Sequence, residues 1–253
     1  MNVLAIGNSF SQDATHYLHQ LAAAQGVDMR VGNLYIGGCS LGRHWENIQA
    51  GTSDYLYEEN GASTGRYVSV EQALGLAPWD VIVTQQASHF SGIPETYEPY
   101  LTQLTDYLRQ KAPRAKLMLH QTWAYEIDSL HPAFVRYGYS QQQMYDRLTQ
   151  AYAQAAQAHH MELIPSGRAV QLLRQRAPFR YQDGGMSLCR DGFHMQITYG
   201  RYLLAAVWYV TLTGQGVAGS AYAPCTPLAP GAVCRPELLR TVQQAAEDAC
   251  ATP

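Results

Sequence analysis

Short apolar runs alternate along the chain with longer segments in which apolar residues recur every three or four positions. Strands that are apolar throughout and separated by helices are typical of a parallel sheet covered on both faces. The pattern therefore predicts an α/β fold with three layers, α/β/α. The five predicted strands are Asn2–Ile6, Arg30–Ile36, Val81–Thr84, Ala115–His120 and Glu162–Ile164.

The longer segments predict the helices that connect these strands. Their approximate bounds are Ser11–Ala24, Leu41–Ala50, Val70–Leu76, Glu95–Lys111, Gln141–His159, Arg168–Arg176, Ile197–Thr213 and Pro236–Cys250. Residues 52–69 interrupt the alternation and predict a β-hairpin that turns at Asn60-Gly61. This hairpin either forms a wall or lid of a site or is a surface feature without a role there. The Gly-, Pro- and Ala-rich stretch from Gly214 to Pro236 predicts a long surface loop.

Composition narrows the class of protein. A chain of 253 residues with 47% hydrophobic and 15% charged residues suits a single large domain over 1–253. A net charge of -3 and a pI of about 6.3 offer no basic surface for a polyanion, so a nucleic-acid partner is not expected. The longest apolar helix contains Arg201 and is short for a membrane span. The chain as given shows no signal peptide, which predicts a cytoplasmic protein without a membrane partner; the pattern leaves the oligomeric state open.

The cysteines and histidines give no sign of a metal site. The five cysteines are scattered, without a C-x-x-C motif, which argues against a disulfide framework or a zinc site. His16 and His19 share one face of a predicted helix but lack a third ligand. We therefore expect neither a metal nor a cofactor.

Ser9, Asp191 and His194 are the residues with the clearest chemistry. Serine is a weak nucleophile that needs an adjacent base and an acid that orients this base. Ser9 follows the first predicted strand, and Asp191 lies three residues before His194, so that one loop carries both. Each residue has a structural role as its alternative: a helix cap for Ser9, a turn residue for Asp191 and a packed histidine for His194. Ser11, followed by Gln12, fits the helix cap better and leaves Ser9 for catalysis.

Three candidate residues follow three different strands. Ser9, Gly38 and Gln86 come directly after the first, second and third predicted strands. In parallel sheets of this kind, ligands bind beyond the carboxyl ends of the strands. The fold alone therefore predicts that these residues share one rim of the sheet.

These residues fall in blocks that resemble the SGNH, or GDSL-like, hydrolase superfamily. The blocks span residues 3 to 195 and contain Gly7-Asn8-Ser9-Phe10-Ser11, Gly37-Gly38-Cys39-Ser40, Gln85-Gln86-Ala87-Ser88-His89 and Asp191-Gly192-Phe193-His194. They are most similar to a bacterial branch with G-N-S-F-S and Q-Q-x-S blocks, which itself resembles carbohydrate acetylesterases. The resemblance implies a flavodoxin-like parallel sheet of five strands in the order 2-1-3-4-5.

The resemblance also implies an oxyanion hole. Its donors are the backbone N–H groups of Ser9 and Gly38, with Gly37 as the alternative to Gly38. The superfamily's third block normally supplies an Asn, which this chain lacks. Some carbohydrate-esterase branches use a Gln there, which places the side-chain donor at Gln86, with His89 as the alternative.

The predicted function is that of a serine esterase that removes short acyl groups, foremost O-acetyl groups on carbohydrate, through an acyl-enzyme. The expected partner is a small-molecule or oligosaccharide ester. Candidate substrate-binding residues are His89, Trp123, Tyr125 and Trp45. The rings of Trp123, Tyr125 and Trp45 could stack on a sugar face, and cavity wall or core is the alternative for these three. A lipolytic or thioester hydrolase of the same fold is the alternative enzyme. A flavodoxin-like binding protein is the alternative without catalysis, although a phosphate-binding Gly-rich loop is missing.

Overall fold

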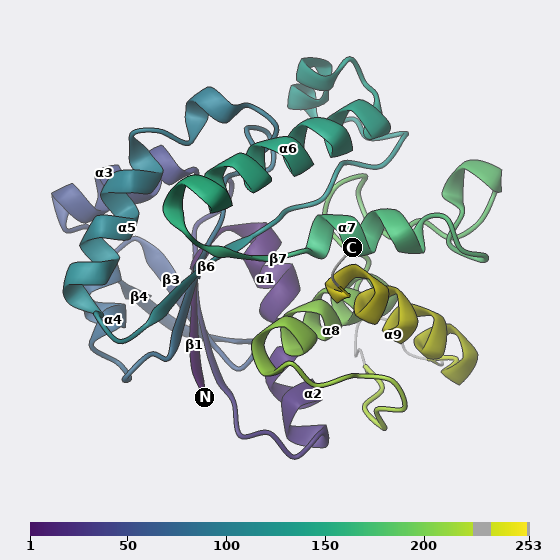
Figure 1. Cartoon of the computed structure of the whole chain (residues 1–253), viewed down its shortest axis with the longest axis horizontal. Coiled ribbons are helices and arrows are strands. Elements are labelled where there is room, and N and C mark those ends of the chain that lie inside the picture. The colour runs from purple at the N-terminus through teal and green to yellow at the C-terminus, as the bar shows by residue number, and fades with distance from the viewer. Residues whose placement is uncertain (225–233, 252–253) are drawn as a thin grey trace.

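All strands of the described chain lie in one twisted sheet (Figure 1). The computed structural model describes residues 1–224 and 234–251, so residues 225–233 of the loop predicted between Gly214 and Pro236 lie outside the described residues. The strands are β1 Asn2–Gly7, β2 Arg30–Tyr35, β3 Tyr55–Glu59, β4 Ala62–Val68, β5 Val81–Thr84, β6 Lys116–His120 and β7 Glu162–Ile164.

The sheet has seven strands in the order β4-β3-β2-β1-β5-β6-β7. The prediction of five strands in the order 2-1-3-4-5 is therefore wrong in number and in overall order. The five apolar strands pair in parallel, whereas β3 pairs with β2, and β4 with β3, in antiparallel. The cause of the difference is the hairpin in residues 52–69, which joins the edge of the sheet instead of standing apart from it.

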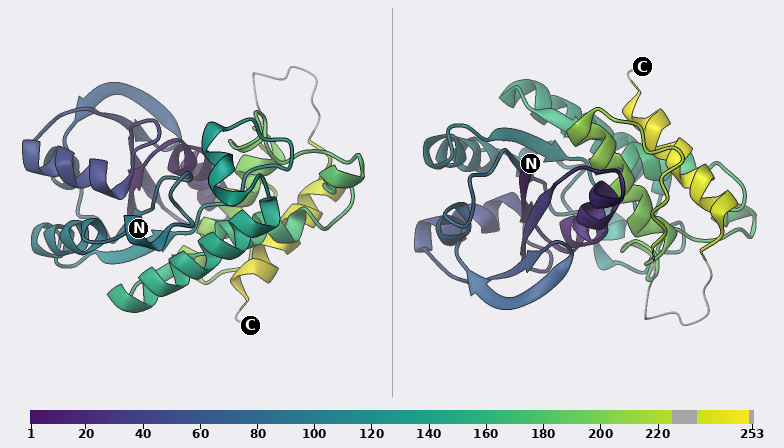
Figure 2. Two further views of the ribbon diagram at one scale, coloured as in Figure 1. Left: turned by 90° about the horizontal axis from the view of Figure 1, so that it is seen from above. Right: turned by 90° about the horizontal axis from the view of Figure 1, so that it is seen from below.

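Helices cover both faces of the sheet, and Figure 2 shows the two layers from above and below. The helices are α1 Ser9–Thr15, α2 Leu18–Ala24, α3 Leu41–Ala50, α4 Val70–Leu74, α5 Tyr100–Lys111, α6 Gln141–His159, α7 Ser166–Leu173, α8 Tyr199–Thr213 and α9 Pro236–Cys250. Short 3-10 helices occupy η1 Pro94–Thr96, η2 Pro132–Tyr137 and η3 Tyr181–Asp183. One layer contains α1, α2, α7, α8 and α9, which pack on one another.

Helix α8 lies at the centre of this layer. Residues 202–209 are all buried, because α1, α2, α7 and α9 contact the helix from several sides. Its only charged residue is Arg201, which binds the buried Asp13 of α1. None of the described helices is both long enough and apolar enough to cross a membrane.

The predicted helix Ser11–Ala24 is broken into α1 and α2 at His16 and Tyr17. The hairpin turn packs against this break. A Cβ atom on Gly61, whose φ is +82°, would lie 2.0 Å from the His16 carbonyl oxygen. Only glycine accepts both this φ and this close approach. The hairpin therefore contacts the end of the helix that carries Ser9.

Candidate active site

Ser9 is the first residue of α1. The strand β1 ends at Gly7, and Asn8 caps the helix: its side chain accepts a hydrogen bond from the backbone N–H of Phe10 at 3.0 Å. The prediction that Ser11 caps the helix is wrong, because Ser11 lies within α1 and its hydroxyl donates to the Asn8 carbonyl at 2.9 Å. Since Asn8 satisfies the helix start, the Ser9 hydroxyl is left for other contacts.

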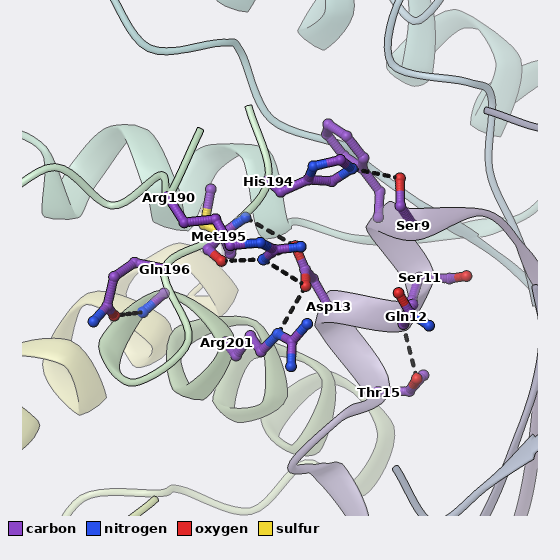
Figure 3. Close-up of polar contacts among 12 residues, drawn as sticks. Ser9, Ser11, Gln12, Asp13, Thr15, Arg190, His194, Met195, Gln196 and Arg201 are labelled. Carbon is purple, nitrogen blue, oxygen red and sulfur yellow. Dashed lines mark hydrogen bonds and ion pairs between the residues drawn. The ribbon is translucent and has the colours of Figure 1, made fainter. Parts of the chain in front are cut away.

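The Ser9 hydroxyl contacts His194, and His194 contacts Asp191. Ser9 Oγ lies 2.8 Å from His194 Nε2, and His194 Nδ1 lies 2.7 Å from Asp191 Oδ2. Because an ionised carboxylate only accepts, Nδ1 carries the ring proton and Nε2 is the acceptor that faces Ser9. In Figure 3 the His194 ring points toward the Ser9 hydroxyl at the start of α1. The structure thus joins the three predicted residues across 185 positions of sequence.

Asp191 is ionised in this arrangement. Burial of the carboxyl raises its pKa, but hydrogen bonds from the His194 side chain and from the backbone N–H groups of His194 and Phe193 outweigh burial, so that the pKa lies below its ordinary value. The two backbone N–H groups lie 2.8 and 3.2 Å from Oδ1. The carboxylate therefore orients the imidazole and stabilises a positive charge on it.

A cavity of about 300 Å³ opens beside the Ser9–His194 contact. Its lining residues are polar, aromatic or glycine, and the described part of the chain contributes no Ala, Val, Leu, Ile or Met side chain to it. Residues from the turn after β1, the loop after β2, the turn after β5 and the loop that contains His194 meet here. The lining residues that were not predicted include Gln12, Tyr35, His131, Arg190 and Phe193. The hairpin in residues 52–69 contributes none of the lining, so it is no wall of this cavity.

Gln86 does not reach the cavity. Its side chain is fully buried, and Nε2 donates to the Thr96 carbonyl at 2.8 Å and to the Thr96 hydroxyl at 3.1 Å. Its Oε1 accepts from the backbone N–H groups of Leu41 and Ala87. Because both N–H bonds of the amide are used, the prediction that Gln86 donates to an oxyanion is wrong. The alternative, His89, does line the cavity.

The loop after β2 brings Gly38 to the cavity. Gly38 has a φ of +63°, a conformation that side chains disfavour, and both Gly37 and Gly38 line the cavity. The Asn8 side chain donates to the Cys39 carbonyl at 2.9 Å. This bond ties the glycine loop directly to the residue before Ser9.

Trp123 and Tyr125 are fully buried and do not line the cavity, so the prediction that they contact substrate is wrong. Trp123 supports the site from behind: its Nε1 donates to the Phe193 carbonyl at 2.7 Å, and its ring stacks on Phe10 at 4.1 Å. The Tyr125 hydroxyl hydrogen-bonds the Ser88 hydroxyl at 2.9 Å.

Trp45 is half-buried on α3 and is also absent from the described lining.

Two histidines other than His194 line the cavity, and both favour the neutral form. Burial lowers the pKa of His89, helped by the nearby His131 and Arg136. Burial and the nearby His194 lower the pKa of His131. In the described parts of the chain, no group of three His, Cys, Asp or Glu side chains is arranged to hold a metal ion.

A buried polar chain lies behind the turn that carries Ser9. Gln85 Nε2 donates to Asn8 Oδ1 at 2.8 Å, and Gln85 Oε1 accepts from His120 Nδ1 at 2.6 Å. His120 Nε2 then accepts from the Ser166 hydroxyl at 3.0 Å. Complete burial lowers the pKa of His120 to about 3, so the ring is neutral and has the donor and acceptor that these partners need. The chain links the Asn8 cap to strands β5 and β6 and to α7.

The fold is similar to those of SGNH hydrolases and acetylxylan esterases. A protein from Slackia heliotrinireducens, named as a candidate SGNH hydrolase, is 27% identical with a TM-score of 0.57 over 84% of this chain and 98% of that chain. An acetylxylan esterase from Geobacillus stearothermophilus, solved as a catalytic mutant, is 14% identical with a TM-score of 0.53 over 84% and 94% of the two chains. The architecture is thus that of an SGNH-type α/β protein.

Within this class, the chain belongs to the DUF4886 family, a domain of unknown function whose profile matches residues 2–232. A DUF4886 family protein from Bacteroides uniformis ATCC 8492 is 38% identical with a TM-score of 0.91, over 100% of this chain and 95% of that chain. Among curated proteins, none matches this sequence.

Proposed function

We propose that this protein is a serine esterase that works through an acyl-enzyme. The observation that carries the proposal is the continuous hydrogen-bonded chain from Ser9 through His194 to Asp191, with contacts of 2.8 and 2.7 Å at the wall of a cavity. A hydroxyl held against a neutral imidazole that a carboxylate orients is what a serine nucleophile requires. The similarity of the fold to SGNH hydrolases supports the same class of enzyme.

Two half-reactions follow from this geometry. Ser9 Oγ attacks the ester carbonyl carbon while His194 Nε2 takes its proton, and His194 then returns the proton to the leaving alcohol. The acyl group stays on Ser9. Water next attacks the acyl carbonyl carbon while His194 Nε2 takes a proton from the water. His194 then returns this proton to Ser9 Oγ as the bond between Ser9 and the acyl group breaks and the carboxylic acid leaves. Asp191 holds the ring and stabilises its charged form in both halves.

The proposed oxyanion donors are the backbone N–H groups of Ser9 and Gly38, with Gly37 as the alternative to Gly38. Backbone N–H groups in the first turn of a helix have no partner within the helix, so the N–H of Ser9 is available. His89 replaces Gln86 as the side-chain donor, because it lines the cavity and its neutral ring still carries one N–H. One donor of this kind contributes roughly 3 kcal/mol to transition-state stabilisation.

The proposed substrates are short acyl esters, foremost O-acetyl groups on carbohydrate. A long acyl chain gains about 0.8 kcal/mol for each methylene that it buries, but only where apolar walls receive it. The described lining has no aliphatic side chain, and its volume of about 300 Å³ is small. Its hydroxyl, amide and imidazole groups instead suit the polar alcohol part of a sugar ester.

A chain-length series tests this proposal. On p-nitrophenyl esters, kcat/KM should fall from acetyl to butyryl and steeply toward octanoyl. Acetate release should then be measured over a panel of acetylated oligosaccharides, with Ser9→Ala as the control for background hydrolysis. Equal or rising kcat/KM toward octanoyl would favour the lipolytic enzyme, and failure of a serine-reactive fluorophosphonate to label Ser9 would favour a binding protein.

A further inference from the structure

Asp13 is a fully buried carboxylate on the same short helix as Ser9. It follows Ser9 by four positions, so the two side chains lie one turn apart on the same face of α1. Figure 3 shows this face, with Ser9 at the start of the helix and Asp13 pointing toward the loop that carries His194. The proposed mechanism leaves this residue without a role.

In the described parts of the chain, the hydrogen-bond partners of the Asp13 carboxylate come from the far end of the sequence. The backbone N–H of Met195 donates to Oδ2 at 2.8 Å. Arg190 Nη1 lies 3.0 Å from both carboxylate oxygens, and Arg201 Nε lies 2.7 Å from Oδ1. The carboxylate thus binds two guanidinium groups and one backbone N–H.

Two of these partners, Arg190 and Met195, flank the loop that holds Asp191 and His194. Arg190 directly precedes Asp191, and Met195 directly follows His194. The loop is closed on itself, because the backbone N–H of Arg190 donates to the His194 carbonyl at 2.9 Å and Arg190 Nη1 also donates to the Met195 carbonyl. Asp13 therefore holds both ends of a closed loop.

The chemistry of a buried ion cluster supports a positional role. Burying a carboxylate and its partners gains little stability over apolar packing of the same volume, whereas the directional bonds of such a group can fix one geometry. Here the fixed geometry includes the contact between His194 Nε2 and Ser9 Oγ at 2.8 Å. Because Ser9 and Asp13 share one helix, the nucleophile and the anchor of its base belong to one rigid element.

We propose that Asp13 is a positioning residue that sets the distance and angle between Ser9 and His194 by holding Arg190 and Met195. The inference rests on the proposed esterase function. It differs from a general role in stability, because it predicts that loss of Asp13 changes the His194 geometry in a protein that stays folded.

The test compares Asp13→Asn with a matched control, Glu247→Gln. Glu247 of α9 also anchors a loop, because its Oε1 accepts from the backbone N–H groups of Val217 and Ala218 at 2.7 and 2.8 Å, but it does not contact the 190–195 loop. Asp13→Asn should lower kcat for p-nitrophenyl acetate by about a hundredfold with KM changed less than about threefold, as expected for a misplacement on the order of 1 Å. Glu247→Gln should lower the melting temperature without this loss of kcat.

Proton NMR of the hydrogen bond between His194 Nδ1 and Asp191 gives a second readout. If Asp13 only stabilised the fold, its loss would leave the signal of the Nδ1 proton unchanged in the folded protein. This downfield signal should be lost or broadened in Asp13→Asn and kept in Glu247→Gln. If Asp13→Asn fails to fold, Arg201→Gln removes only the Asp13 partner in α8 and should produce a smaller loss of both kcat and signal. A folded Asp13→Asn protein with wild-type kcat and signal would overturn the inference, and so would an unaffected Arg201→Gln protein.

The Asp13→Asn, Arg190→Gln double variant shows whether Asp13 acts on kcat through Arg190 or independently of it. If Asp13 acts through Arg190, the double variant should be no slower than the slower single variant, whereas multiplied losses would contradict the proposal. Failure of the esterase function itself has a different signature: wild-type Ser9 would not react with a fluorophosphonate. The NMR comparison would still test the role of Asp13 in that case.

Discussion

The turns after β1 and β5 lie side by side, yet their polar residues serve different ends. After β1, the Ser9 hydroxyl lines the cavity and contacts His194. After β5, Gln86 is fully buried and bonds Thr96, Leu41 and Ala87. The position after a parallel strand brings both residues to the same rim of the sheet. Whether a side chain reaches the cavity depends on the segments that pack over it, here η1 and the start of α3.

The largest effect should come from Ser9→Ala. Removing the nucleophile should lower kcat by on the order of 10⁴-fold or more. The fold should be kept, because the hydrogen bond that the described structure gives the Ser9 hydroxyl is to His194 in the cavity lining and not to a core residue. Ester hydrolysis and circular dichroism of the purified variant measure the two quantities. If the variant keeps substantial activity above background, Ser9 is not the nucleophile, and the turn after β1 then has no catalytic role that the turn after β5 lacks.

Asp191→Asn should have the next largest effect, roughly a thousandfold in kcat, because the imidazole loses its orienting charge. Steady-state kinetics on p-nitrophenyl acetate measure the loss. A kcat close to that of wild type would show that Asp191 does not act on His194.

The lowered pKa of Asp191 also predicts a pH dependence of stability. A carboxyl whose pKa is lower in the folded state contributes stability above its unfolded pKa of about 3.9, and this contribution is lost as pH falls through the folded value. Wild type should therefore lose more stability than Asp191→Asn when denaturant unfolding is compared at pH 6 and at pH 3. Equal losses would argue against the hydrogen bonds that lower this pKa.

Gly38→Ala should lower kcat by about tenfold. Its φ of +63° disfavours a side chain, although a Cβ there meets nothing within 4 Å, so the cost is a shift of the backbone and its N–H rather than a clash. Steady-state kinetics on an acetyl ester measure the loss of kcat, and KM should change little. An unchanged kcat would move the donor assignment to Gly37.

Gln86→Ala should have the smallest effect on activity and a clear effect on stability. The change leaves the backbone N–H groups of Leu41 and Ala87 without a partner, which should lower the free energy of unfolding by about 2 kcal/mol. Activity per folded molecule, counted by fluorophosphonate labelling, should stay within about threefold. His89→Ala is the matched comparison: it should lower kcat and leave the free energy of unfolding nearly unchanged. A hundredfold loss of kcat in Gln86→Ala at unchanged stability would restore Gln86 as the donor.

Local signals located the parallel strands and the Ser9, Asp191 and His194 residues that meet in the structure. Apolar runs reveal buried strands, and the spacing of Asp191 and His194 places both on one loop. The sequence does not reveal which polar side chains form hydrogen bonds with residues far away along the chain. For this reason, the prediction that Gln86 and Trp123 contact the substrate is wrong. Asp13 was missed for the same reason, although one signal was present: Arg201 is a lone charge in an otherwise apolar helix.

The hairpin β3–β4 changes which strand ends the sheet. Four consecutive residues of β2, 31 to 34, are buried, so without the hairpin this strand would present its unpaired backbone groups at the edge of the sheet. The actual edge strand, β4, is exposed along residues 62–67 and includes Arg66, and its pairing with β3 shifts register between Tyr57 and Glu58. Polar, irregular edges resist strand pairing between molecules. The hairpin thus protects the sheet against edge-to-edge aggregation.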